Sequence, residues 1–168
     1  MVNFQAKFIP HLSSRAHSLN ELLGKKTWKW TQKCTKAFQE IKEAISAETL
    51  LLHYDAKKDV TMATDASPYG VAAVILQRDN KGQMRPVAFA SRSLTTAEEG
   101  YAQLDREGLA IVFGLQKFNM YLYGRHFTIL TDNQPLERIF GPTTAIPTLA
   151  AQRLQRWAVM LSAYQYEI

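Results

Sequence analysis

Residues 60–76 read Val60-Thr61-Met62-Ala63-Thr64-Asp65-Ala66-Ser67-Pro68-Tyr69-Gly70-Val71-Ala72-Ala73-Val74-Ile75-Leu76. In the first six residues of this stretch, Val60, Met62 and Thr64 alternate with the other three side chains, which predicts a strand that ends at the turn 67–70. Residues 71–76 are apolar throughout, as expected of an inner strand covered on both faces. A turn at 79–82 and a further run at 86–91 predict a third strand. Tight turns between three consecutive strands predict an antiparallel meander.

A long amphipathic helix is expected after the meander. Thr95 or Thr96 is a suitable N-cap, and Gly124 a suitable end. The apolar stripe of this helix consists of Tyr101, Leu104, Gly108, Ile111, Leu115, Phe118 and Leu122. Phe127, Ile129 and Thr131 then form one face of a strand, and a helical crossover returns such a strand to the same sheet in parallel orientation. This order of three antiparallel strands, a long helix and a parallel strand predicts an α/β fold with a mixed sheet.

The first fifty residues have a helical pattern instead. Residues 17–23 predict a short helix stopped by Gly24. Thr31 is a plausible N-cap for a second helix, whose apolar positions are Cys34, Phe38, Ile41 and Ile45. We therefore expect a small helical unit over 1–50 and the α/β domain over 59–168.

Composition excludes several classes of protein. The chain has 168 residues, of which 46% are hydrophobic and 21% charged, so it is neither disordered nor fibrous. The longest apolar run, residues 71–76, is too short to span a membrane. A single cysteine, Cys34, forms no internal disulfide and is expected in the core, and the four histidines lack metal-ligand spacing. Without a secretory or transit signal, an intracellular protein is expected, in the cytoplasm or nucleus.

The net charge of +5 belongs to the N-terminal third. Residues 1–58 carry ten Lys/Arg and five Asp/Glu, whereas residues 59–168 carry ten of each. The segment around Trp28 and Trp30 is rich in lysine: Lys25, Lys26, Lys29, Lys33 and Lys36. This mixture suits a nucleic-acid backbone, although a solvated helix face explains it equally well.

Three acidic residues suggest a metal-dependent nuclease. Asp65 and Asp132 each close a predicted strand, and both carboxylates emerge at the same end of the sheet if the strands are parallel neighbours, about 4.8 Å apart. Glu107 lies about 60° from the centre of the helical stripe and leans toward the sheet. Three such carboxylates repel one another unless a cation lies among them, and hard oxygen ligands select Mg²⁺ or Mn²⁺. Two such ions can activate water and stabilise the leaving oxygen of a phosphodiester.

Each acid also has an ordinary structural explanation. Asp65 precedes a turn, where aspartate is common. Asp132 could cap the short helix expected near Pro135. Glu107 could pair at a helix edge with Arg106, Arg125 or Lys117. The joint pattern of the three favours the nuclease hypothesis.

Several motifs resemble those of one family. They are Thr64-Asp65-Ala66-Ser67, Pro86-Val87-Ala88-Phe89-Ala90-Ser91-Arg92, Asp105-Arg106-Glu107-Gly108-Leu109, Tyr121-Leu122-Tyr123-Gly124, Thr131-Asp132-Asn133-Gln134-Pro135 and Arg153-Leu154-Gln155-Arg156-Trp157. Together they resemble the ribonuclease H domain of Ty3/gypsy-type LTR retrotransposon reverse transcriptase polyproteins. Residues 2–10 and 30–38 resemble the thumb and connection that follow the polymerase palm. The resemblance covers nearly the whole chain, in order.

The resemblance implies a ribonuclease H-like fold and an endonuclease that cleaves the RNA strand of an RNA/DNA hybrid. Asp65, Glu107 and Asp132 match the first three members of a metal-binding acidic quartet, with Mg²⁺ or Mn²⁺ as cofactor. RNA would be recognised through 2′-hydroxyls and the shape of the minor groove. Ser67, Arg92 and Gln134 flank this site and are candidates for substrate contact.

The chain departs from the family pattern in two ways. The fourth acid of the family follows a further strand, and Ile168 falls in the position expected for that strand. The Tyr-x-Asp-Asp signature of the polymerase is missing, and the motif at Met1 normally continues upstream. We therefore expect a piece of a larger polyprotein, with the polymerase domain as a neighbour. The alternative is a catalytically dead or domesticated remnant that only binds nucleic acid.

Overall fold

The computed structural model describes residues 9, 11–24, 28–46, 51–132, 134–141 and 152–168. In chain order the elements are α1 (Leu12–Arg15), α2 (His17–Gly24), α3 (Gln32–Ser46), β1 (Thr61–Ala66), β2 (Gly70–Arg78), β3 (Met84–Ser93), α4 (Thr96–Glu99), α5 (Gln103–Lys117), α6 (Asn119–Leu122), β4 (His126–Leu130), α7 (Gln134–Phe140), α8 (Gln152–Leu161) and β5 (Gln165–Glu167). No helix in these ranges is long and apolar enough to cross a membrane.

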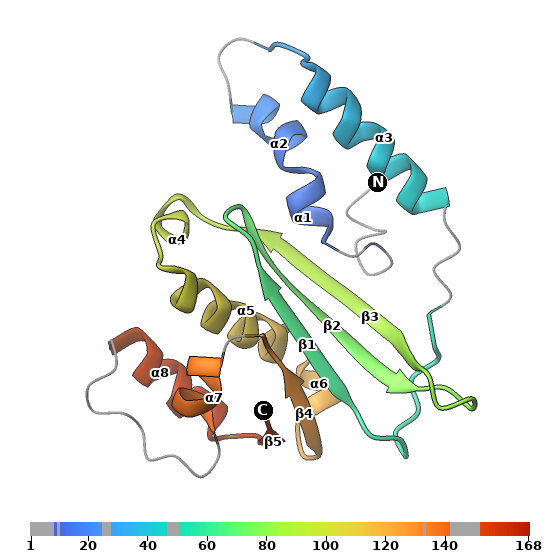
Figure 1. Ribbon diagram of the computed structural model, residues 1–168, viewed down its shortest axis with the longest axis vertical. Helices are drawn as coiled ribbons and strands as arrows, with labels where there is room; N and C mark the ends of the chain where they lie inside the picture. Colours follow the sequence, from blue (N-terminus) through green and yellow to red (C-terminus); the bar gives the residue numbers. More distant parts are fainter. Residues whose placement is uncertain (1–8, 10, 25–27, 47–50, 133, 142–151) are drawn as a thin grey trace.

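The five strands form one mixed sheet of order β3-β2-β1-β4-β5 (Figure 1). The predicted meander is confirmed, because β1–β2 and β2–β3 pair in antiparallel orientation. The predicted parallel strand is also confirmed, since β4 pairs in parallel with β1, matching Thr61 with Thr128 and Ala63 with Leu130. A short parallel strand, β5, follows beside β4, where a further strand was expected.

The main core lies between the sheet and α5. Met62 and Ala73 point toward this helix, because a Cβ atom added to Gly114 would lie 2.7 Å from the Met62 sulfur and 3.0 Å from the Ala73 Cβ. Fully buried Ile111 and Leu115 of the helix complete this layer. The lack of a side chain at Gly114 thus lets the helix approach the sheet closely.

The helical unit contacts the opposite face of the sheet. Asp65 pairs with Ala72, and Ala72 pairs with Ser91, so these residues lie across one face. Helix α1 contacts this face, where the Ser13 backbone N–H donates to Ser91 Oγ at 3.1 Å. At Gly70, an added Cβ would lie 2.6 Å from Ser13 Oγ. The absence of a side chain at Gly70 therefore allows α1 to approach the sheet.

The expected long helix after Thr95 is wrong in its extent. Thr95 does cap a helix and forms a capping box with Glu98, but this helix, α4, is only four residues long. The chain then becomes extended at Ala102, from which α5 begins, and Phe118 departs from helical geometry before α6. The crossover therefore consists of three helices, α4, α5 and α6. The apolar stripe continues in the sequence across the breaks between these helices, so it did not indicate where they occur.

Two further packing expectations need correction. Phe38 of α3 is 56% exposed, and Ala37 takes its place beside Cys34 on the buried side. Thr31 does cap α3, because its hydroxyl accepts from the Cys34 backbone N–H at 3.4 Å. Gly108 packs against a helix and not on the sheet, since an added Cβ would lie 3.1 Å from the Trp157 ring of α8.

Candidate active site

The parallel pairing of β1 and β4 brings the two aspartates to one end of the sheet. The last paired residues are Ala63 and Leu130. Asp65 and Asp132 each lie two residues beyond this pair, so they occupy equivalent positions where the strands separate. Both residues are exposed. The sheet thus places two carboxylates at the open end between adjacent strands.

Glu107 approaches this end from α5 and is almost fully buried, with 4% of its surface exposed. Its Oε1 accepts a hydrogen bond from the Gln103 side-chain amide, one helical turn earlier. Its carboxylate also accepts from the backbone N–H of Ala66, at the end of β1. Its Oε2 is buried and has no hydrogen-bond partner in the described part of the chain. These hydrogen bonds therefore hold the Glu107 carboxylate in place, whereas its Oε2 atom lacks a hydrogen-bond partner among the described residues.

The electrostatic environment disfavours the charged form of Glu107. Burial, the charge of Asp132 and the charge of Asp65, in that order of size, raise the Glu107 pKa from 4.5 to about 7. The hydrogen bonds from Gln103 and Ala66 act in the opposite direction and are too weak to compensate. Glu107 is thus close enough to both aspartates to interact with them electrostatically, even though the three acids come from separate parts of the chain.

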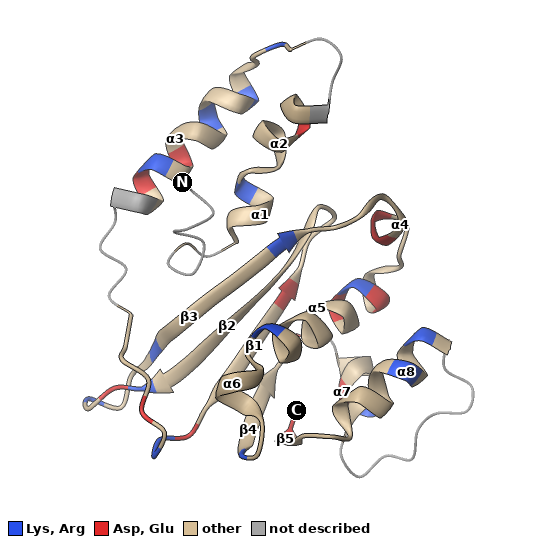
Figure 2. Cartoon of the chain, turned by 180° about the vertical axis from the view of Figure 1, so that it is seen from behind, with Lys and Arg blue, Asp and Glu red and all other residues tan. Residues whose placement is uncertain are grey.

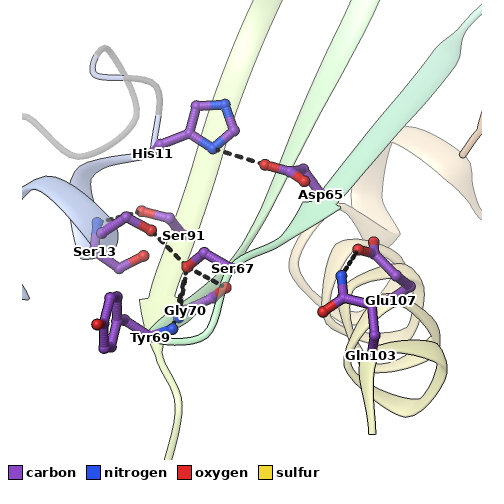
Figure 3. A network of polar contacts seen from close by, with 10 residues as sticks. His11, Ser13, Asp65, Ser67, Tyr69, Gly70, Ser91, Gln103 and Glu107 are labelled. Carbon is purple, nitrogen blue, oxygen red and sulfur yellow. Dashed lines mark hydrogen bonds and ion pairs between the residues drawn. The ribbon is translucent and has the colours of Figure 1, made fainter. Parts of the chain in front are cut away.

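Asp65 has a different contact in this structure. Its carboxylate lies 3.5 Å from Nδ1 of His11, at the start of α1, and points toward that ring (Figure 3). Both side chains are about half exposed, so the contact contributes little stability. His11 has a left-handed backbone with φ of 52°. As placed, no three Asp, Glu, His or Cys side chains of the described residues form a metal-binding group.

The donor set nevertheless fits a hard divalent cation. A buried carboxylate oxygen without a partner is costly unless a positive charge or a donor compensates it. Glu107 Oε2 is such an atom, and two further carboxylates lie near it. Oxygen ligands of this kind suit Mg²⁺ or Mn²⁺. For the three acids to share one ion, the Asp65 side chain has to rotate away from His11.

The three predicted substrate-contact residues differ in their surroundings. Ser67 Oγ accepts from the backbone N–H of Gly70 at 3.0 Å and contacts Ser14 Oγ at 2.9 Å, so it is engaged within the fold. Arg92 forms a bidentate pair with Glu98, at 2.7 and 2.9 Å. Gln134 is exposed at the first position of α7. Of the three, Gln134 is the most accessible.

Sequence reasoning missed two residues of this site. Gln103 orients Glu107, and its spacing of four residues on a helix is a signal that could have identified it. His11 contacts Asp65 from another part of the chain. No local pattern predicted its position, because it depends on how the helical unit packs against the sheet.

The sequence is similar to known reverse transcriptase and retrotransposon sequences. Residues 30–129 match a family model described as the RNase H-like domain found in reverse transcriptase. The Transposon Tf2-3 and Tf2-4 polyproteins of Schizosaccharomyces pombe are each 36% identical over 170 residues, which covers 99% of this chain. The chain spans only 12% of the length of these relatives.

Solved structures share the fold. The foamy viral protease-reverse transcriptase in complex with RNA/DNA hybrid matches with a TM-score of 0.68 and 22% identity, over 99% of this chain and 23% of that chain. The same enzyme in complex with dsDNA matches with a TM-score of 0.70 and 23% identity, over 98% of this chain and 34% of that chain. The mixed sheet with its helices is thus an RNase H-like α/β fold.

Proposed function

The chain belongs to the family of RNase H-like domains found in reverse transcriptase, and we propose that it cleaves the RNA strand of RNA/DNA hybrids as a module of a retroelement polyprotein. The observation that carries this proposal is the unsatisfied, buried Oε2 of Glu107 beside Asp65 and Asp132. A foamy viral relative in fold was solved with an RNA/DNA hybrid, which is consistent with this substrate.

In this proposal Asp65, Glu107 and Asp132 hold Mg²⁺ or Mn²⁺, as one ion or a pair. Bound there, the metal supplies an activated water and stabilises the leaving oxygen of the phosphodiester. Gln103 and the Ala66 N–H fix the orientation of Glu107. Because burial and the two aspartates raise the Glu107 pKa to about 7, this carboxyl is protonated in part of the molecules at neutral pH, and cation binding releases that proton.

Substrate recognition is proposed at the rim of the same end of the sheet. Gln134 is exposed there as a hydrogen-bonding residue, and we assign it to contact with the hybrid. Arg92 contacts a phosphate only if it leaves Glu98, so its contribution is expected to be smaller. The remaining polyprotein, including the polymerase domain, is the proposed partner that delivers the hybrid inside the cell.

The test is cleavage of an end-labelled RNA/DNA hybrid with Mg²⁺ or Mn²⁺. It compares this chain, a longer piece of the same polyprotein, and Asp65→Asn in each. Asp59→Asn is the matched control, since Asp59 is an exposed aspartate just before β1. We expect metal-dependent cleavage that Asp65→Asn abolishes and Asp59→Asn retains. Cleavage that survives Asp65→Asn would contradict the assignment.

The second candidate is a module that binds hybrid without cutting it. The position of Asp65 beside His11 favours this reading, because in this arrangement the three acids, all among the described residues, do not form a metal-binding group. Salt-sensitive hybrid binding with no metal-stimulated cleavage, in the longer piece as well, is the result that selects it over the nuclease.

A further inference from the structure

The helical unit carries an exposed aromatic surface that the proposed active site does not use. Trp28, Trp30 and Phe38 are 69%, 44% and 56% exposed, respectively. The Trp28 and Trp30 ring centroids lie 5.9 Å apart, and those of Trp30 and Phe38 lie 6.4 Å apart. These three residues, named here the aromatic strip, form one continuous apolar surface.

The aromatic strip is held in place by the start of α3. Indole Nε1 of Trp30 donates to Thr35 Oγ1 at 2.8 Å, which fixes the central ring. On its other side α3 buries Cys34 and Ile41, so the helix is already anchored within its unit. The outward position of the three rings therefore costs no core contacts, and their surface is available to a ligand.

The charge around the aromatic strip is mainly positive, with Glu40 beside Lys36 as an exception. Residues 22–39 contain five lysines and no Asp or Glu. Of these lysines, Lys29, Lys33 and Lys36 lie within the described residues and are exposed. Lys36 lies 3.8 Å from Glu40 in a surface pair. Figure 2 shows both basic and acidic residues along α3, whose acidic residues, Glu40 and Glu43, lie in the second half of the helix. The ligand that complements this surface is anionic.

We propose that the aromatic strip and its lysines bind single-stranded nucleic acid. Flat rings stack on unpaired bases, whereas the bases of a duplex are stacked on each other and offer no free face. Lysines beside the rings neutralise the phosphates of the same strand. The exposed lysines beside the rings, Lys29, Lys33 and Lys36, favour a nucleic-acid strand over a purely apolar protein partner.

The position of the aromatic strip agrees with this ligand. The start of α3 and the β1–β2 turn lie at the same end of the molecule, with the helical unit extending beyond the turn (Figure 1). Asp65 lies at that end of β1. The helical unit that carries the aromatic strip therefore lies toward the same end of the molecule as the proposed cleavage site. The binding surface itself does not depend on the cleavage activity.

The experiment measures binding of a labelled oligothymidylate of roughly 20 nucleotides by fluorescence anisotropy, without divalent metal. Omitting the metal separates this test from the proposed cleavage. We expect Trp28→Ala to weaken binding roughly 5- to 150-fold, the range for loss of one base–aromatic stack. Trp28→Phe is expected to retain much of the affinity. Met120→Ala is the control, because Met120 is a 96% exposed apolar residue on α6.

Salt dependence tests the lysines. Lys33→Gln is expected to reduce the slope of log affinity against log salt by about 0.7, the value for one phosphate contact on a single strand. Lys81→Gln, at the β2–β3 turn, is the matched control and is expected to keep the slope. Circular dichroism verifies that each variant is folded.

Two results would overturn the proposal. One is wild-type affinity for the oligonucleotide in both Trp28→Ala and Lys33→Gln. The other is that Trp28→Ala leaves strand binding intact but disrupts association with the polymerase part of the polyprotein, which would make the aromatic strip a protein interface.

Discussion

Replacement of Glu107 by glutamine is expected to remove a pH dependence of stability. The raised pKa means that the folded state binds a proton more tightly than the unfolded chain, so stability is lost as pH rises from 4.5 through about 7. A shift from 4.5 to about 7 corresponds to about 3 kcal/mol at high pH. When the pH is raised from about 5 to about 8, the free energy of unfolding of the wild-type protein is expected to fall by about 2.5 kcal/mol more than that of Glu107→Gln.

The assay is urea unfolding of both proteins at the two pH values, without divalent metal. Comparing changes with pH, and not absolute stabilities, removes the effect of placing an amide beside Gln103. Glu99→Gln is the control, because Glu99 is exposed on α4, and it is expected to retain the wild-type response. Equal pH responses in the wild type and Glu107→Gln would refute the electrostatic account of this site. Added Mg²⁺ is expected to restore stability at the higher pH in the wild type only.

Three other substitutions test the fold around the site. Gly70→Ala is expected to cost about 1–3 kcal/mol in urea unfolding, because the new Cβ meets the Arg92 carbonyl oxygen at 2.8 Å as well as Ser13; full stability would contradict the close approach of both groups to Gly70. Thr95→Ala removes one half of a capping box and is expected to cost about 1 kcal/mol by the same measurement. Glu98→Gln is expected to cost about 1–2 kcal/mol at neutral pH, since Arg92 lowers the Glu98 pKa to about 2. The stability that this ion pair contributes is lost as pH falls from 4.5 toward 2. A difference in stability from the wild type that persists in strong acid would therefore argue against the ion pair.

The arrangement of the sheet could be predicted because its determinants are local. Alternation over residues 60–65 and the tight turns after it specify the meander, and the long helical segment requires a parallel return. The positions of Asp65 and Asp132 at adjacent strand ends follow from that topology. The angle of Glu107 on its helix likewise predicted that it faces the sheet, and the structure places it against Ala66.

The remaining features depend on contacts between distant segments. The exposure of Phe38 is decided by which side of α3 packs within the helical unit, and periodicity alone did not distinguish it from Ala37. The close approach at Gly108 depends on Trp157, some fifty residues further along the chain. The contact of His11 with Asp65 requires α1 to pack on the sheet, for which the sequence carries no periodic signal.

The pairing of β1 with two different neighbours has a consequence for folding kinetics. β1 and β2 are adjacent in sequence and can pair early, whereas β1 and β4 meet only after the whole helical crossover has closed a long loop. Asp65 therefore acquires Asp132 as a neighbour in a late step. A partly folded chain contains Asp65, Glu107 and Asp132 without their final arrangement. We expect the proposed ribonuclease activity to appear only with completed folding.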